Sequence, residues 1–160
     1  MHDSRPTLER GAIAGAIGAT TVAVFFLAYD LIRGTPLRTP ALVASLGAAR
    51  DATELSLLPI AIFTLIHFAL FIAVGIAITW LIGRFYIRPH VLLGAVFGFL
   101  LFDLLFYAGS VITGVNVVRE IGWPAVLAAN MIAGVAMFAY LKATAPEPRS
   151  RRASSPRTTA

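Results

Sequence analysis

The residues of this chain that could do chemistry are polar side chains in the middle of long apolar segments. Asp103, His67 and Asn130 each lie in a segment that otherwise carries almost no charge. An aspartate at the centre of a membrane helix costs about 2.5 to 3.5 kcal/mol, so it has to face other helices and find a partner or a proton. We expect His67 to be that partner, because histidine titrates near neutral pH and a carboxylate can hold its orientation.

Hydroxyl groups extend this polar layer, at Thr20, Thr21, Thr64 and Tyr107. At a rise of about 1.5 Å per residue, the central polar groups of four segments fall at a similar depth in the membrane. Two interpretations stay open at this point. The layer is either a proton-handling pair at the floor of a small polar site, or a set of hydrogen bonds that fixes how apolar helices pack.

The polar side chains are informative because the composition indicates a membrane protein. Of the 160 residues, 58% are apolar and 13% are charged, whereas a soluble domain has roughly 25% charged residues. Four segments are long and apolar enough to cross a bilayer, at about 11–32, 57–83, 91–113 and 123–141. We therefore expect an all-α protein, a four-helix transmembrane bundle within residues 1–142.

The loop between the first two spans has its own signals. Thr39 stands before a proline, where it can cap a short helix that stops at Gly47, and we expect this helix to lie in the membrane interface. At the end of the first span, Asp30 and Arg33 are three residues apart, which predicts an ordinary ion pair along one helix face. The short segment 84–90 predicts that the second and third spans are antiparallel neighbours.

The basic residues favour one orientation. Nine of the 13 Lys and Arg residues lie before the first span, in the second loop or after the last span, against four in the other two loops. Cytoplasmic loops are enriched in Lys and Arg, so both termini are expected in the cytoplasm, with 143–160 as a disordered basic tail. The abundance of Arg, Ala and Gly is typical of a GC-rich bacterial genome, and we expect the bacterial inner (plasma) membrane.

Two pairs of glycines have the GxxxG spacing that lets membrane helices approach closely, Gly11 with Gly15 and Gly94 with Gly98. Gly94 and Asp103 are nine residues apart, which places them on opposite faces of an α-helix. If Asp103 faces the bundle, Gly94 and Gly98 face a flanking helix, either of the same chain or of another subunit.

Other site classes are not favoured. The chain has no cysteine, and His67 and His90 are separated by about 20 to 25 Å of helix, which is too far for two axial ligands of one haem. The sequence has no metal-ligand cluster, no HExxH and no GxSxG, so we expect neither a cofactor nor an enzyme. The net charge of +5 is explained by anionic lipid headgroups without a nucleic acid.

The function we expect from the sequence is that of a non-catalytic accessory, assembly or scaffolding subunit. It would act through helix–helix contacts, with itself or with another membrane protein, in the lipid bilayer. The alternative is a small oligomeric protein that conducts protons or a solute, using His67 and Asp103.

Overall fold

The computed structural model describes residues 5–48, 57–104, 107–108, 111 and 121–145. Over these residues the chain is helical apart from turns, and no strand occurs among them. Three helices are long and apolar enough to cross a membrane: α1 (Arg5–Ile32), α3 (Leu57–Phe85) and α7 (Trp123–Ala143). The predicted all-helical class is therefore confirmed, and these three candidate membrane-spanning helices coincide with three of the four predicted spans.

The third predicted span, residues 91–113, has a different structure. Helix α4 (Val91–Phe97) continues directly into a π-helix, η1 (Gly98–Phe102), in which the backbone hydrogen bonds skip one residue more than in an α-helix. The helical backbone continues through Leu104. Beyond it, residues 107, 108 and 111 are the part of this span that the structure describes, so a fourth crossing and a four-helix bundle remain predictions.

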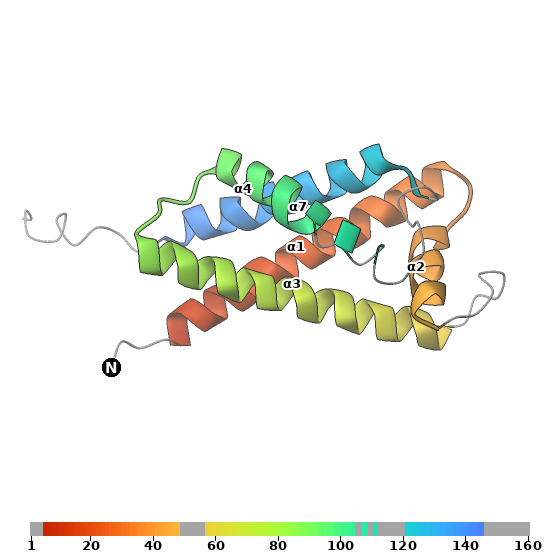
Figure 1. Ribbon diagram of the computed structural model, residues 1–160, viewed down its shortest axis with the longest axis horizontal. Helices are drawn as coiled ribbons and strands as arrows, with labels where there is room; N and C mark the ends of the chain where they lie inside the picture. Colours follow the sequence, from red (N-terminus) through yellow and green to blue (C-terminus); the bar gives the residue numbers. More distant parts are fainter. Residues whose placement is uncertain (1–4, 49–56, 105–106, 109–110, 112–120, 146–160) are drawn as a thin grey trace, which may run out of the picture.

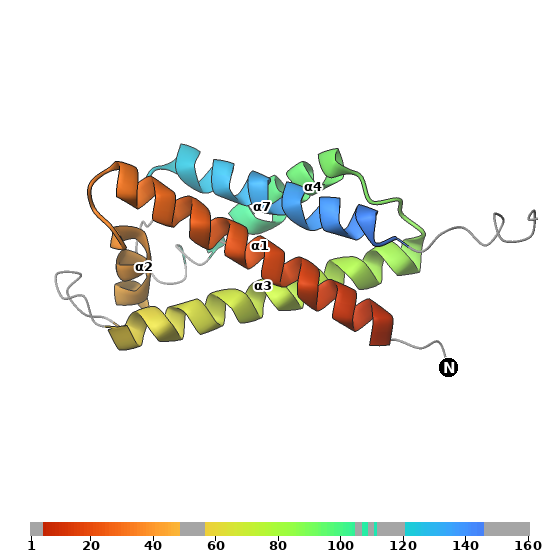
Figure 2. The ribbon, with the colours of Figure 1, turned by 180° about the vertical axis from the view of Figure 1, so that it is seen from behind.

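The long helices lie side by side in the order α3, α1, α7, α4 (Figures 1 and 2). Helix α1 packs against both α3 and α7, while α4 and η1 pack against α7. Helices α3 and α4 follow one another in the chain, yet among the described residues they are not packed as neighbours. The prediction that these two segments are neighbouring helices is wrong, because the glycines of each segment fit closely against a different helix.

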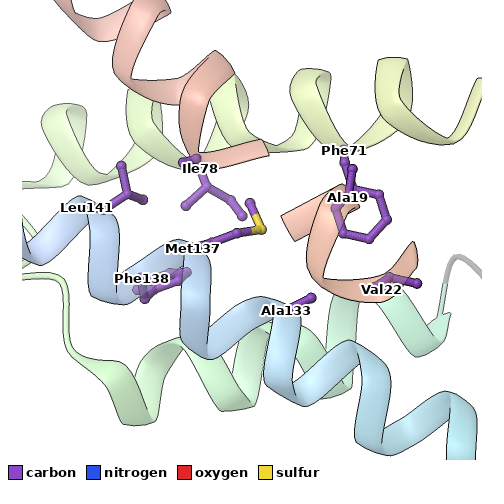
Figure 3. Packing of buried hydrophobic residues seen from close by; sticks show 9 residues of the cluster. Ala19, Val22, Phe71, Ile78, Ala133, Met137, Phe138 and Leu141 are labelled. Atoms are coloured by element: carbon purple, nitrogen blue, oxygen red, sulfur yellow. The ribbon is translucent and has the colours of Figure 1, made fainter. Parts of the chain in front are cut away.

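The core lies where α1 is enclosed between α3 and α7 (Figure 3). A side chain at Gly18 would lie 2.5 Å from Met137 Sδ and 2.9 Å from a ring carbon of Phe71. The small Gly18 thus leaves the space that Met137 fills from α7 and Phe71 fills from α3. The buried apolar residues of this cluster are Ala14, Ala19, Val22, Phe71, Ile78, Ala133, Met137, Phe138 and Leu141.

The predicted short helix is present as α2 (Arg38–Ala48), which crosses the end of the molecule where α1 ends and α3 begins (Figure 1). Asp30, the last charged residue of α1 before the turn, is 2% exposed and supplies the cap of α2. Its carboxylate accepts hydrogen bonds from the Thr39 backbone N–H, at 2.7 Å, and from the Thr39 hydroxyl, at 2.8 Å. A negative charge at a helix N-terminus is stabilising, so Asp30 holds α2 against the end of α1.

The expected ion pair between Asp30 and Arg33 is not formed. The carboxylate of Asp30 is turned into the start of α2, and the Arg33 guanidinium lies over the ring of Tyr29, 4.6 Å from its centre. The Tyr29 hydroxyl donates a hydrogen bond to the Ile121 carbonyl at 3.4 Å. Spacing along one helix suggested a local pair, but the helix end turns Asp30 toward a stronger set of donors.

Replacing Asp30 with alanine is expected to loosen α2 without unfolding the long helices. Loss of a cap of this kind costs about 1 to 2 kcal/mol, which corresponds to amide exchange in α2 that is about 5- to 30-fold faster. Hydrogen–deuterium exchange with peptide-level detection measures this directly. Arg33→Ala is the matched control and should leave α2 protected; equal protection of α2 in Asp30→Ala and the unmodified chain would contradict the capping role.

Candidate intramembrane polar site

Asp103 is hydrogen-bonded to Asn130. The Asn130 side-chain amide donates to Asp103 Oδ1 at 2.8 Å, and Asn130 itself is only 7% exposed on α7. Asn130 lies about 4 to 5 Å along the axis from the middle of α7, so this pair sits at the central depth of a membrane-spanning helix. The second carboxylate oxygen, Asp103 Oδ2, is buried and has no hydrogen-bond partner.

The π-helix explains why Asp103 faces α7. In a regular α-helix each residue turns by about 100°, and Gly94 and Asp103 would point in opposite directions. The η1 turn contains one additional residue, which sets the following residues back by about 100°. Asp103 is thereby returned to the side of α7, and the prediction that the glycine face and the aspartate face are opposed is wrong.

Gly98 and Asp103 show the effect most directly. They are five residues apart, one π turn, and both lie against Asn130. A side chain at Gly98 would collide with the Asn130 backbone, whose carbonyl carbon would be 2.9 Å from the added atom. The close approach at Gly98 thus brings Asn130 near enough for its amide to reach the carboxylate one π turn away.

His67 lies in a different interface from Asp103. Its Nε2–H donates to the Ala19 carbonyl of α1 at 3.2 Å, since a carbonyl oxygen can only accept. Its ring packs against Phe71, with ring centres 4.7 Å apart. The expected hydrogen bond between His67 and Asp103 is not present: His67 belongs to the contact of α3 with α1, and Asp103 to the contact of η1 with α7.

The hydroxyl groups do not join these two sites. Thr21 and Thr64 each donate to a carbonyl of their own helix, Ile17 at 2.7 Å and Ile60 at 2.8 Å. Thr20 is exposed, and Tyr107, one turn beyond Asp103, is 65% exposed. The polar layer predicted from depth is therefore divided among separate interfaces and outward-facing positions, because equal depth does not require a common direction.

Both predicted glycine pairs are used inside the chain. Gly11 and Gly15 lie against α3, where side chains on them would be 2.5 Å from the Cα atoms of Ile76 and Ile72. On the facing helix, a side chain at Gly75 would be 2.6 Å from the Gly15 nitrogen. Two backbones approach here as closely as membrane helices can.

The second crossing repeats this arrangement between α4, η1 and α7. A side chain at Gly94 would be 2.7 Å from Phe138 Cβ, and one at Gly134 would be 2.9 Å from the Gly98 nitrogen. The intersubunit role that the sequence left open for Gly94 and Gly98 is therefore filled within the chain.

One residue of these crossings escaped the sequence interpretation. Gly75 has no glycine four residues away, but Thr79 stands at that spacing, and both are buried. A small residue of either kind completes the spacing, so Gly75 with Thr79 is the signal that could have indicated where α1 meets α3.

Known proteins provide no further assignment. Among the described residues, no three His, Asp or Glu side chains are grouped as metal ligands. Neither a protein-family model, nor a curated protein, nor a solved structure matches this chain.

Proposed function

We propose that this chain is a non-catalytic subunit that associates with another membrane protein through α3. The observation that carries the proposal is how little of α3 its own chain covers. In its most apolar stretch, mean hydropathy is 2.5 and 6% of the residues are buried, against 33% in α1 and 50% in α7. The glycine faces are occupied internally, so α3 offers the largest exposed apolar surface among the described helices for a partner.

Three of the exposed residues of α3 have the spacing of a helix-packing stripe. Leu58, Ile62 and Leu65 follow one another at intervals of four and three residues and are 69%, 49% and 71% exposed. This spacing keeps them on one side of the helix. A partner helix would pack along this side, while lipid alone would cover it in a chain that acts by itself.

We also propose that the chain lies in a bacterial inner membrane with both termini in the cytoplasm. The start of α1 and the ends of α3 and α7 lie at the same end of the molecule (Figure 1). Each of these segments carries a basic residue, which supports a single orientation: Arg10, Arg84 and Lys142, with Arg88 in the loop after α3. Arg10 also donates to the Leu141 carbonyl at 3.2 Å and to the Thr144 hydroxyl at 3.3 Å, which satisfies the end of α7.

The test is site-specific photocrosslinking in native membranes, with a photoreactive residue in place of Leu65. We expect a discrete adduct with one other membrane protein, recovered in fixed proportion in mild detergent. The matched control is Leu92 of α4, 77% exposed, which should give lipid adducts. Lipid adducts alone at both positions, with a chain that purifies alone and monomeric, would contradict the proposal.

A second candidate function is favoured by one specific observation. A buried carboxylate oxygen without a partner, Asp103 Oδ2, is typical of intramembrane groups that handle ions or protons. This supports the alternative of a small oligomeric conducting protein, now based on Asp103 and Asn130 rather than on His67. Proton flux into liposomes that contain the purified chain distinguishes the two, because the accessory subunit is expected to give none.

A further inference from the structure

Asp103 is a partly buried acid whose hydrogen bonding is incomplete in the described part of the chain. An ionised carboxylate accepts on both oxygens, and Asp103 uses one of them, Oδ1, with Asn130. The other oxygen, Oδ2, is enclosed without a donor. Asp30 is the internal comparison: it is buried, and both of its oxygens accept hydrogen bonds, from Thr39.

Among the described residues, the helices that pack most closely against η1 are α4 and α7, and they place no positive charge near Asp103. Helix α4 contains no titratable residue, and those of α7, Tyr140 and Lys142, lie at its C-terminal end, about three turns beyond Asn130. An unpaired charge at the centre of a membrane helix is costly, and one neutral amide offsets only part of that cost.

We propose that Asp103 and Asn130 form a proton-binding site, in which Asp103 is a neutral carboxylic acid at neutral pH. Asn130 donates to Oδ1, so the bound proton resides on Oδ2. A metal cation is the less suitable ligand, because one carboxylate and one amide supply too few oxygens for the six or so that Na⁺, Ca²⁺ or Mg²⁺ requires, and no other His, Asp or Glu among the described residues joins them.

This inference does not depend on the proposed function, since a proton can be held by an accessory subunit as well as by a conducting protein. Failure to find a crosslinked partner at α3 would leave it standing. In the same way, an ionised Asp103 would not affect the proposed association through α3.

The test is infrared spectroscopy of the full chain in lipid bilayers at pH 7, where a protonated carboxyl has a C=O stretch that a carboxylate lacks. We expect one such band, shifted by ¹³C labelling of aspartate and lost in Asp103→Asn. In Asn130→Leu the band should move to higher frequency, because the C=O loses its hydrogen bond. Asp30→Asn is the matched control and should keep the band unchanged.

Two results would overturn the proposal. One is the absence of a protonated aspartate band in the unmodified chain at pH 7, which needs no variant and is therefore independent of whether Asp103→Asn folds. The other is a band that survives in a folded Asp103→Asn protein, or disappears in Asp30→Asn, which would assign the proton to another acid.

Discussion

Gly15→Ala is expected to disrupt the contact between α1 and α3 and to destabilise the protein by at least about 1 to 3 kcal/mol. The added methyl would lie 2.5 Å from Ile72 Cα and 2.7 Å from Ile72 N. These are backbone atoms of a continuous helix and cannot rotate aside as a side chain can. The two helices must therefore separate over the length of their crossing, which weakens the neighbouring contact of Phe71 with Gly18.

Gly83→Ala is the matched control for this prediction. It makes the same change in α3, and a side chain at Gly83 has no atom within 4 Å. Alanine is favoured over glycine inside a helix by about 1 kcal/mol, so this variant should be at least as stable as the unmodified chain. The measurement is the midpoint of unfolding in detergent, followed by circular dichroism; equal midpoints for the two variants would show that the close crossing does not contribute to stability.

Asn130→Leu is expected to be the most damaging change of a polar residue. Leucine keeps the branched shape of asparagine and is somewhat larger, so the variant removes the donor to Asp103 without creating a cavity. With Oδ2 already unpartnered, the Asp103 carboxyl would then have no hydrogen bond. The expected loss is about 1 to 3 kcal/mol for a neutral acid, and about 3 to 5 kcal/mol if the acid is ionised.

A double-mutant cycle separates the pair from its surroundings. Asp103→Leu in the Asn130→Leu background removes the carboxyl group that has lost its donor, and it should restore part of the lost stability. The expected coupling energy between Asp103 and Asn130 is about 0.5 to 3 kcal/mol. Thr20→Ala is the control, because Thr20 lies at the middle of α1 but is exposed. Strict additivity of the two single changes, measured by the same unfolding assay, would mean that the hydrogen bond between Asn130 and Asp103 contributes nothing.

Much of the secondary structure could be predicted from apolar length alone. Residues 57–83 and 123–141 were expected as spans and are found within Leu57–Phe85 and Trp123–Ala143. The first helix begins at Arg5, six residues before the apolar segment does. Hydropathy marks the part of a helix that suits hydrocarbon, whereas backbone hydrogen bonds continue the helix into the polar residues beyond it.

The residues of the candidate site could be predicted from the sequence, but which of them contact one another could not. Asp103, Asn130 and His67 stood out because polar side chains are rare and costly in such segments. His67 and Asp103 were expected to be in contact because they lie at a similar depth in the membrane. Depth gives the position along the membrane normal only, and it does not say toward which helix a side chain points. The partners depended on which helices became neighbours, and α3 and α4 each packed against another helix.

Composition and the positions of the charged residues are enough to indicate a helical protein with membrane-spanning segments. They also identify the few polar residues within those segments. Tertiary structure decided that Asp103 meets Asn130, that Asp30 caps α2, and that both glycine pairs serve contacts within the chain. The physical reason is that the hydrophobicity of a segment is the sum over its own residues and can be read without knowing its neighbours in space. The direction of a side chain, in contrast, changes by about 100° when one turn of a helix takes up a single extra residue.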